Sequence, residues 1–182
     1  MPPKAVKSIR DLLFWQYAKI IAASAGLGKK NYRFVMSKYK QLQSGRIKWS
    51  TSIREWVKEH ERPGECGYCG AKMDDLTVEH ILPRSRGGPD TPDNVVLVCA
   101  RCNLKKGSKR LYEWFGLDRR DEVPRVAEGK YLKLLHELHE RTGTLDVDDP
   151  SKLCRRCDLG TECPVPGTLS VYCLEGVFLK KP

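Results

Sequence analysis

The stretch CGYCGAKMDDLTVEHILPRSRGG, from Cys66 to Gly88, decides the fold at the centre of this 182-residue chain. It begins with a Cys-x2-Cys pair, and a second pair with the same spacing follows after 29 intervening residues. Four thiolates at this spacing close a tetrahedral zinc site without an open position. We therefore expect a structural zinc ion held by Cys66, Cys69, Cys99 and Cys102. Bound zinc would supply folding free energy that a short two-stranded hairpin lacks by itself.

The residues around the cysteine pairs predict a strand, a loop, a second strand and a helix. Residues 76–81 are β-prone, and residues 84–94 are rich in Gly, Pro and Asp, as loops are. Residues 95–98 form a second β-prone run, and a helix is expected from Ala100 toward Trp114. The expected order is therefore a Cys-x2-Cys pair, a strand, a loop, a second strand, the second Cys-x2-Cys pair and a helix.

Further helices are expected on both sides of this region. Two of them begin at a capping box, in which Ser precedes an acidic residue by three positions: Ser8 with Asp11, and Ser52 with Glu55. The expected helices cover about residues 8–26, 31–42, 52–60 and 130–141. His136 and His139 lie on the last of them. Because no cysteine or acidic partner is fixed near them in the sequence, we expect both at the surface.

The charge of the chain is concentrated in its first third. The formal net charge is +10, and residues 1–62 hold 14 Lys/Arg against 4 Asp/Glu. Such an excess favours a polyanionic partner, with nucleic acid first, and predicts binding that weakens steeply with salt. Lys30 and Arg33 lie on the basic face of the second helix and are expected DNA contacts; a merely solvated face is the alternative. No segment approaches the length of a membrane span, so no membrane partner is expected.

Two longer stretches add a family resemblance to the cysteine pattern. VEHILPRSRGG, followed by DNVVLVCARCNLKKG, resembles the HNH endonucleases in their zinc-stapled form. The resemblance runs from about Cys66 to Gly107. It rests on several features in order: His followed by Ile-x-Pro, a Gly-Gly loop, Asn before a hydrophobic strand, and Cys-x2-Cys-Asn-x2-Lys.

The resemblance implies a ββα-metal finger with three signature residues, His80, Asn94 and Asn103. His80 would be the general base that deprotonates the attacking water. Glu79 and Asn103 would supply oxygen ligands to a catalytic Mg²⁺ or Mn²⁺, and Asn94 would orient the loop or His80 by hydrogen bonds. The basic side chains that would hold the DNA backbone are Arg84, Arg86, Lys105 and Lys106.

The chain departs from the family pattern at two positions. Glu79 stands where the family more often has Asp, and Asn103 stands at a position that the family often fills with His. Without the second histidine the ligand set is harder, which favours Mg²⁺ or Mn²⁺ over zinc. Adjacent strand residues also point to opposite faces. For Glu79 and His80 to serve one site, the strand must twist, bulge or end near Pro83.

A second group of cysteines lies near the C-terminus, with spacings of x2, x5 and x9. A second structural zinc site is expected here, a 4Fe–4S cluster is the alternative, and disulfides are a third reading. The residues concerned are Cys154, Cys157, Cys163 and Cys173. No catalytic residue is evident in this module, so its expected role is stabilisation or DNA contact.

The sequence thus predicts an α+β fold that is mainly helical, with a central ββα-metal finger stapled by a four-cysteine zinc site and a small C-terminal module of four more cysteines. The expected regions are a basic helical DNA-binding region at 1–62, the HNH nuclease module at 63–120, and a helix with the C-terminal module at 121–182. The expected function is divalent-metal-dependent hydrolysis of DNA. The alternative is a non-catalytic, zinc-stapled nucleic-acid-binding protein, and RNA cleavage and a dimeric state stay open. Free thiols as ligands favour the reducing cytoplasm.

Overall fold

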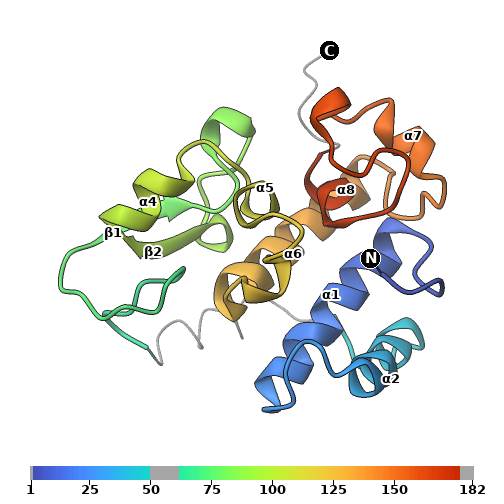
Figure 1. The fold of residues 1–182 in the computed structure, drawn as a ribbon, viewed down its shortest axis with the longest axis horizontal. Helices are drawn as coiled ribbons and strands as arrows, with labels where there is room; N and C mark the ends of the chain where they lie inside the picture. The colour runs from blue at the N-terminus through green and yellow to red at the C-terminus, as the bar shows by residue number, and fades with distance from the viewer. Residues whose placement is uncertain (1, 50–61, 177–182) are drawn as a thin grey trace. The chain divides into compact units, whose positions relative to one another are not determined.

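The computed structural model describes residues 2–49 and 62–176, and Figure 1 shows the chain as a ribbon. The chain divides into two compact units: a first unit of residues 1–49 and 135–182, and a second unit of residues 50–134. Helices together with a two-stranded antiparallel sheet confirm the expected α+β class. The helix expected from Ser52 with Glu55 lies outside the described residues.

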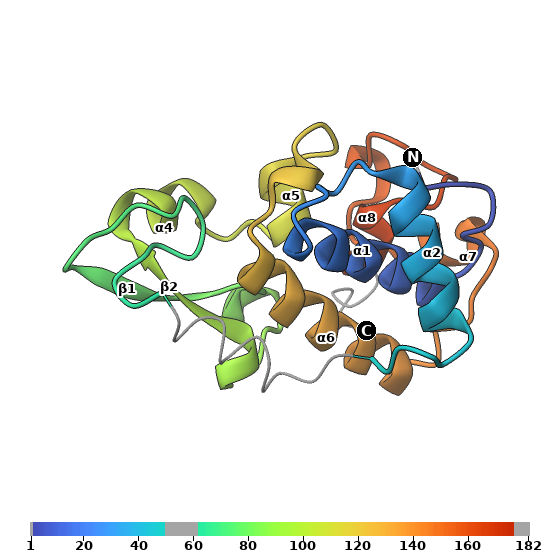
Figure 2. The same ribbon diagram turned by 90° about the horizontal axis from the view of Figure 1, so that it is seen from below.

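The first unit is built around two packed helices, α1 (Ile9–Ser24) and α2 (Tyr32–Gln43), which lie side by side in Figures 1 and 2. The Ser8 hydroxyl accepts a hydrogen bond from the Asp11 amide, and the Asp11 carboxylate accepts from the Ser8 amide, which confirms the capping box. The buried residues of α1 include a run of large aliphatic side chains, and Trp15 meets Tyr39 of α2 edge to face at 5.9 Å. Apolar burial of this kind is what holds two short helices together.

The C-terminal part of the chain completes the first unit. It comprises the end of α6 (Arg125–Arg141), α7 (Pro150–Cys154), the 3-10 turn η4 (Gly160–Glu162) and α8 (Val171–Glu175). Helix α8 packs on α1. The division between the two units falls within α6, between Leu134 and Leu135.

The prediction that both α6 histidines lie at the surface is wrong for His139. Its side chain is fully buried, Nε2 faces the Leu174 carbonyl at 3.0 Å, and Nδ1 faces the Thr144 hydroxyl at 2.7 Å. The carbonyl can only accept, so Nε2 carries the proton and Nδ1 accepts from Thr144 in the neutral ring. A buried imidazole with both nitrogens satisfied is a packing element of the first unit. His136 is half-buried and stacks on Trp49 with ring centroids 5.0 Å apart.

The buried imidazole predicts a pH-dependent stability. Burial lowers the pKa of His139 from 6.5 to about 4, the Leu174 carbonyl acts in the opposite direction, and His136 adds to the lowering. Between these two pH values the unfolded chain binds a proton that the folded chain does not, so stability falls as the pH falls from 6.5 toward 4. The full loss is about 3 kcal/mol. Urea unfolding of wild type and His139→Gln from pH 4 to 7.5 checks it. The variant should lack this part of the slope, and equal slopes would contradict the assignment.

The second unit contains the predicted strand pair. Strand β1 (Leu76–His80) pairs antiparallel with β2 (Val95–Cys99), with Thr77 opposite Val98 and Glu79 opposite Val96. Helix α4 (Ala100–Lys106) follows β2 directly and contacts both strands. The remaining elements are the 3-10 turns η1 (Arg84–Arg86), η2 (Pro92–Asn94) and η3 (Arg120–Glu122), helix α5 (Leu111–Phe115) and the start of α6.

The helix expected to run toward Trp114 is interrupted, and this part of the prediction is wrong. Helix α4 ends at Lys106, and α5 begins only at Leu111. Gly107 has a φ of +54°, which glycine adopts at little cost and which ends a right-handed helix. The break leaves α4 as a two-turn helix laid against the strand pair.

None of the helices among the described residues combines the length and the apolar character that a bilayer span requires. The three functional regions at 1–62, 63–120 and 121–182 stay a prediction about roles. In the structure, the described parts of the first region and the end of the last belong to one compact unit.

Candidate active site and metal centres

The central cysteines form a close cluster of sulfur atoms. The four Sγ atoms of Cys66, Cys69, Cys99 and Cys102 lie within 4.8 Å of one another, and those of Cys69 and Cys99 are 3.9 Å apart. A tetrahedron with zinc–sulfur distances of about 2.3 Å has edges of about 3.8 Å. The first pair stands in the turn before β1, and the second pair joins the end of β2 to α4. The cluster therefore suits one zinc ion that ties both strands to the helix.

The backbone around Cys66 favours its thiolate. Burial opposes the charged form, but amide hydrogen bonds from Cys99, Cys69 and Tyr68 outweigh it and lower the pKa of the Cys66 thiol to about 6. One of these bonds runs from the Cys99 amide to the Cys66 sulfur at 3.3 Å. A thiolate that accepts amide hydrogen bonds is prepared for a metal ion, because metal ligands must be deprotonated.

His80 ends β1, and its ring is held by a carboxylate that the sequence did not single out. Nε2 of His80 lies 3.0 Å from Oδ1 of Asp90, in the loop between the strands. The hydrogen bond from His80, followed by the charge of Arg84, lowers the pKa of the Asp90 carboxyl. The carboxylate is the acceptor, so Nε2 carries the proton and the neutral ring has its free lone pair on Nδ1. The His80 side chain is 21% exposed.

Asn94 fastens the loop that carries Asp90. Its buried amide oxygen accepts from the Leu82 amide at 2.9 Å, and its Nδ2 donates to the Leu82 and Pro89 carbonyls at 2.9 and 2.8 Å. The loop passes so close to Leu82 that a Cβ at Gly88 would lie 1.8 Å from the Leu82 carbonyl oxygen. Only glycine fits there, which accounts for the second residue of the Gly-Gly pair.

Glu79 faces α4 rather than the loop. Lys106 Nζ donates to Glu79 Oε1 at 2.5 Å and to the His80 carbonyl at 3.0 Å, and the Lys106 side chain is fully buried. Lys106 was expected to hold the DNA backbone; the structure gives it an acidic side chain as its neighbour and no exposed surface. The Glu79 and His80 side chains thus have different partners, as neighbouring strand residues must. The Lys106 ammonium nevertheless contacts both residues.

Asn103 lies on the same strand–helix interface as Glu79. Its Nδ2 donates to the Thr77 hydroxyl at 3.1 Å, and that hydroxyl donates to the Val98 carbonyl. Thr77 and Glu79 are two residues apart on β1 and share a face, and Asn103 and Lys106 are three apart on α4 and share a face. The two contacts are therefore neighbours, which brings the Glu79 carboxylate and the Asn103 amide onto one interface.

Two oxygens on this interface suit a hard divalent cation. Within the described residues, Oε2 of Glu79 and Oδ1 of Asn103 make no hydrogen bond. Mg²⁺ binds through one or two such oxygens and keeps several waters. The donor set therefore fits the catalytic cation that the family resemblance implies.

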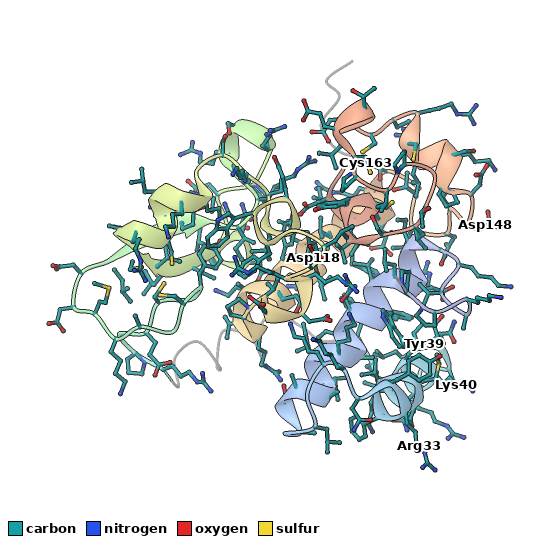
Figure 3. All side chains as sticks on the ribbon, viewed as in Figure 1. Arg33, Tyr39, Lys40, Asp118, Asp148 and Cys163 are labelled. Atoms are coloured by element: carbon teal, nitrogen blue, oxygen red, sulfur yellow. The ribbon has the colours of Figure 1, made fainter. Side chains whose placement is uncertain are left out.

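The other predicted DNA contacts lie at or near the surface. Arg84 and Lys105 are exposed in the second unit, and Arg86 is half-buried. In the first unit, Lys30 and Arg33 are exposed at the start of α2, and Figure 3 labels Arg33 there. The four exposed residues, Arg84, Lys105, Lys30 and Arg33, have side chains that reach solvent.

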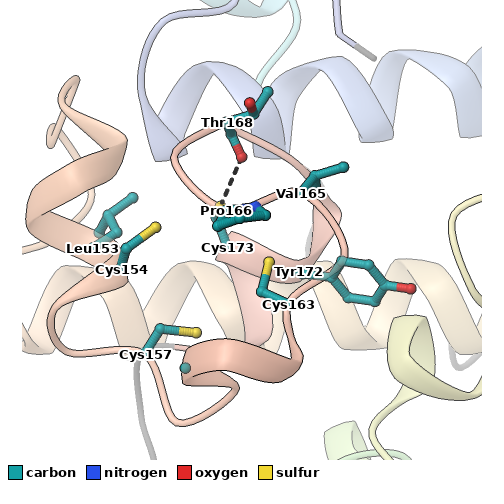
Figure 4. A pocket seen from close by; sticks show the side chains of 10 residues that line it. Leu153, Cys154, Cys157, Cys163, Val165, Pro166, Thr168, Tyr172 and Cys173 are labelled. Carbon is teal, nitrogen blue, oxygen red and sulfur yellow. Dashed lines mark hydrogen bonds between the residues drawn. The ribbon is translucent and has the colours of Figure 1, made fainter.

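The C-terminal cysteines surround a pocket (Figure 4). Cys154 ends α7, Cys173 lies on α8, and Cys157 and Cys163 come from the turns between them. The other lining side chains are mostly apolar. Burial raises the pKa of the Cys173 thiol to about 11, and its sulfur donates to the Thr168 carbonyl at 3.6 Å.

Sequence reasoning missed Asp90 and the buried position of Lys106. Asp90 and Asp93 stand in the same loop, and nothing in their spacing selects the one that meets His80. In the structure, Asp93 instead pairs with Lys133 at 2.8 Å. The choice between Lys105 and Lys106 likewise depends on which side of α4 faces β1.

Comparison with known proteins assigns the central segment. Residues 66–109 match the family model of the HNH endonucleases. Over 53 residues the chain is 38% identical to CRISPR-associated endonuclease Cas9 of Corynebacterium diphtheriae, which covers 28% of this chain and 5% of that protein. Over 73 residues it is 33% identical to the Type IV methyl-directed restriction enzyme EcoKMcrA of Escherichia coli, which covers 34% of this chain and 26% of that protein.

The chain thus spans only a small part of either relative's length. No solved structure gives a significant match. The matched segment coincides with the strand pair, α4 and the close cysteine cluster. Residues 66–109 of this chain are an HNH endonuclease domain.

Proposed function

We propose that this protein is a divalent-metal-dependent endonuclease that hydrolyses DNA phosphodiester bonds with His80 as the general base. The HNH domain indicates nuclease activity in general. The observations that support the finer proposal are the pairing of His80 with Asp90 and the oxygen donors that the adjacent residue Glu79 and Asn103 present at the strand–helix interface. A base, the group that orients it and a pair of hard metal ligands are the parts that such a hydrolysis needs.

His80 acts through its Nδ1. Because Asp90 accepts the proton on Nε2, the lone pair of the neutral ring is on the nitrogen that faces away from Asp90. That nitrogen takes a proton from the water that attacks phosphorus. The Asp90 carboxylate then stabilises the imidazolium that forms and keeps the ring in one orientation. Asp90 is thus a positioning residue, and His80 is the catalytic one.

Glu79 and Asn103 would hold the cation, with Lys106 fixing the Glu79 carboxylate from the protein interior. The cation supplies charge stabilisation for the phosphoryl oxygens and the leaving oxygen. The Lys106 ammonium offsets part of the negative charge of Glu79 and holds the His80 backbone at the strand end. Lys106 therefore serves the site from inside the protein rather than by contact with DNA.

The remaining basic residues would bind the DNA backbone. Arg84, Arg86 and Lys105 belong to the HNH domain, and Lys30 and Arg33 belong to the part of the chain that holds the whole net charge of +10. Each phosphate neutralised releases counterions, so affinity should fall steeply with salt. Cutting both DNA strands would need a second copy of the protein or a second binding event. The proposed compartment is the cytoplasm, because its reducing conditions keep the cysteine thiols available as metal ligands.

Plasmid nicking tests the proposed function. Wild type with Mg²⁺ or Mn²⁺ should convert supercoiled DNA to open circles, and EDTA should stop the reaction. His80→Ala should lower the single-turnover rate by about 10²–10⁴-fold, the contribution of a positioned general base. Its zinc content and circular dichroism serve as the folding control. Cleavage at the wild-type rate by a folded His80→Ala protein would contradict the assignment.

A matched pair of variants at Asp90 separates orientation from catalysis. Asp90→Ala removes the acceptor for Nε2 and should lower the rate about 10–100-fold with KM unchanged, the scale on which orienting partners act. Asp90→Asn keeps an oxygen that accepts the same proton and should recover part of the rate. Equal losses in both variants would show that the negative charge, not the orientation, is what matters.

The rival function is a non-catalytic nucleic-acid-binding protein. It predicts that the folded, zinc-loaded wild type shifts DNA in a gel without cutting it in either metal, and that His80→Ala binds equally well. A labelled RNA of the same sequence, run beside the DNA, distinguishes the third option. The free Nδ1 of His80 and the two oxygens of Glu79 and Asn103 on one interface favour catalysis, since a pure binder has no use for them together.

A further inference from the structure

The pocket between α7 and α8 differs in kind from the central cysteine cluster. Among the residues that the structure describes, the central set is the group of metal-ligating atoms that gathers within 4.8 Å. The sulfurs of Cys154, Cys157, Cys163 and Cys173 instead surround a cavity of about 40 Å³ (Figure 4). About 10–15 Å³ is enough for one water molecule. A lone zinc ion bound to four sulfurs at about 2.3 Å would leave no such space.

The lining of the pocket restricts what can fill it. Beside the four cysteines, it consists mainly of Leu153, Val165, Pro166 and Tyr172, with no carboxylate or imidazole. A hard cation would find no oxygen-rich site there, and two disulfides would not need a central space. Four thiolates around an apolar cavity are the ligand set of an iron–sulfur cluster, whose irons and sulfides separate the cysteine sulfurs.

Two backbone features constrain the positions of two of these sulfurs, those of Cys173 and Cys157. The Ser170 amide donates to the Cys173 sulfur at 3.4 Å, a type of bond that tunes and orients a ligand sulfur. Gly176 approaches the Cys157 sulfur so closely that a Cβ there would lie 2.3 Å from it. With any larger residue at this position, Cys157 would have to turn or the backbone would have to move.

We propose that the four C-terminal cysteines bind a [4Fe–4S] cluster. The cluster is structural: α7 and α8 have five residues each and are too short to be stable alone, so bonds from both helices to one cluster hold them in place. Through α8 the cluster also supports α1, on which α8 packs. The assignment does not depend on the nuclease function.

Metal analysis of the full chain tests the proposal. The protein is expressed with added iron and zinc and purified without oxygen, and iron, acid-labile sulfide and zinc are measured. About four iron, four sulfide and one zinc per chain are expected, with a broad absorption band that reduction bleaches. About two zinc ions and no iron would overturn the proposal, and so would a metal-free pocket with oxidised thiols. The iron, sulfide and zinc content of the wild-type protein tests the proposal whether or not any variant folds.

Three variants locate the cluster. Cys163→Ser should lose most of the iron and sulfide and keep the one zinc. Gly176→Ala keeps all four thiols but displaces Cys157, so its iron should be released several-fold faster to a chelator. Thr161→Ala changes an exposed side chain of η4 that does not line the pocket, and should match wild type. Full iron in Cys163→Ser, or iron loss in Thr161→Ala alone, would contradict the site.

Discussion

Removing zinc from the central cysteine cluster should unfold the segment that carries the proposed active site. Protein treated with a strong chelator, or carrying Cys102→Ser, should lose the protection of its β1 and β2 amides against hydrogen exchange, and nicking activity should disappear with it. Structural zinc sites contribute apparent binding free energies of about 10–16 kcal/mol. No other contact among the described residues of the segment is of that size.

The expected effect is large because the two strands have few other stabilising interactions. Each strand has five residues, and the sheet has two strands. A two-stranded sheet is marginal in water, and α4 has only seven residues. The metal joins the turn before β1, the end of β2 and the start of α4 at one point. Without the metal, the four cysteines no longer link the turn before β1, the end of β2 and the start of α4.

The control for this prediction is Cys163→Ser, which removes a thiol from the other cysteine group and should leave exchange in β1 and β2 unchanged. Amides in β1 and β2 that stay protected in the zinc-free protein would contradict the prediction. Readdition of zinc should restore both protection and activity, because the site closes only when all four thiolates are bound.

Lys106→Met destabilises the second unit by about 3–5 kcal/mol, the cost of breaking a buried ion pair from one side. The Lys106 side chain is fully buried and that of Glu79 is 11% exposed. Methionine fills a similar volume but leaves the carboxylate without its ammonium and the His80 carbonyl without its donor. Urea unfolding of the full chain, followed by a probe in the second unit, measures the effect.

Lys105→Met is the matched control. It removes the same charge at the next position of α4, where the side chain is exposed, and should change stability by less than about 0.5 kcal/mol. The double variant Glu79→Gln, Lys106→Met removes the unpaired charge and should recover part of the loss. A cost at position 106 no larger than at position 105 would show that the pair is not buried in solution.

Much of the fold was predictable because its signals are local. The cysteine spacing predicted which four thiols gather, and the Ser8–Asp11 pair predicted where α1 begins, since a capping box involves residues three apart. The β-prone runs predicted both strands to within one residue at an end. In the capping box and the strands a short stretch of chain contains the whole signal, and in the cysteine cluster the repeated Cys-x2-Cys spacing is the signal.

The details of the site were not predictable because they depend on which faces meet. Lys105 and Lys106 are alike in sequence, but only Lys106 lies on the side of α4 that faces β1. Asp90 meets His80, ten residues before it, because of the path of the loop between the strands, and His139 is buried by a segment 35 residues away along the chain. Side-chain partners at such separations follow from packing, which one-dimensional patterns do not contain.

The loop fastened by Asn94 has a consequence for the entropy of catalysis. Fixing the backbone of one residue costs roughly 1–2 kcal/mol of conformational free energy. The three hydrogen bonds of Asn94 and the close approach of Gly88 to Leu82 fix this loop when the chain folds. In the proposed reaction, Asp90 would therefore be ordered before a phosphodiester arrives, and substrate binding would not have to supply that ordering. Folding would thus supply the conformational ordering that a flexible loop would require each time substrate binds.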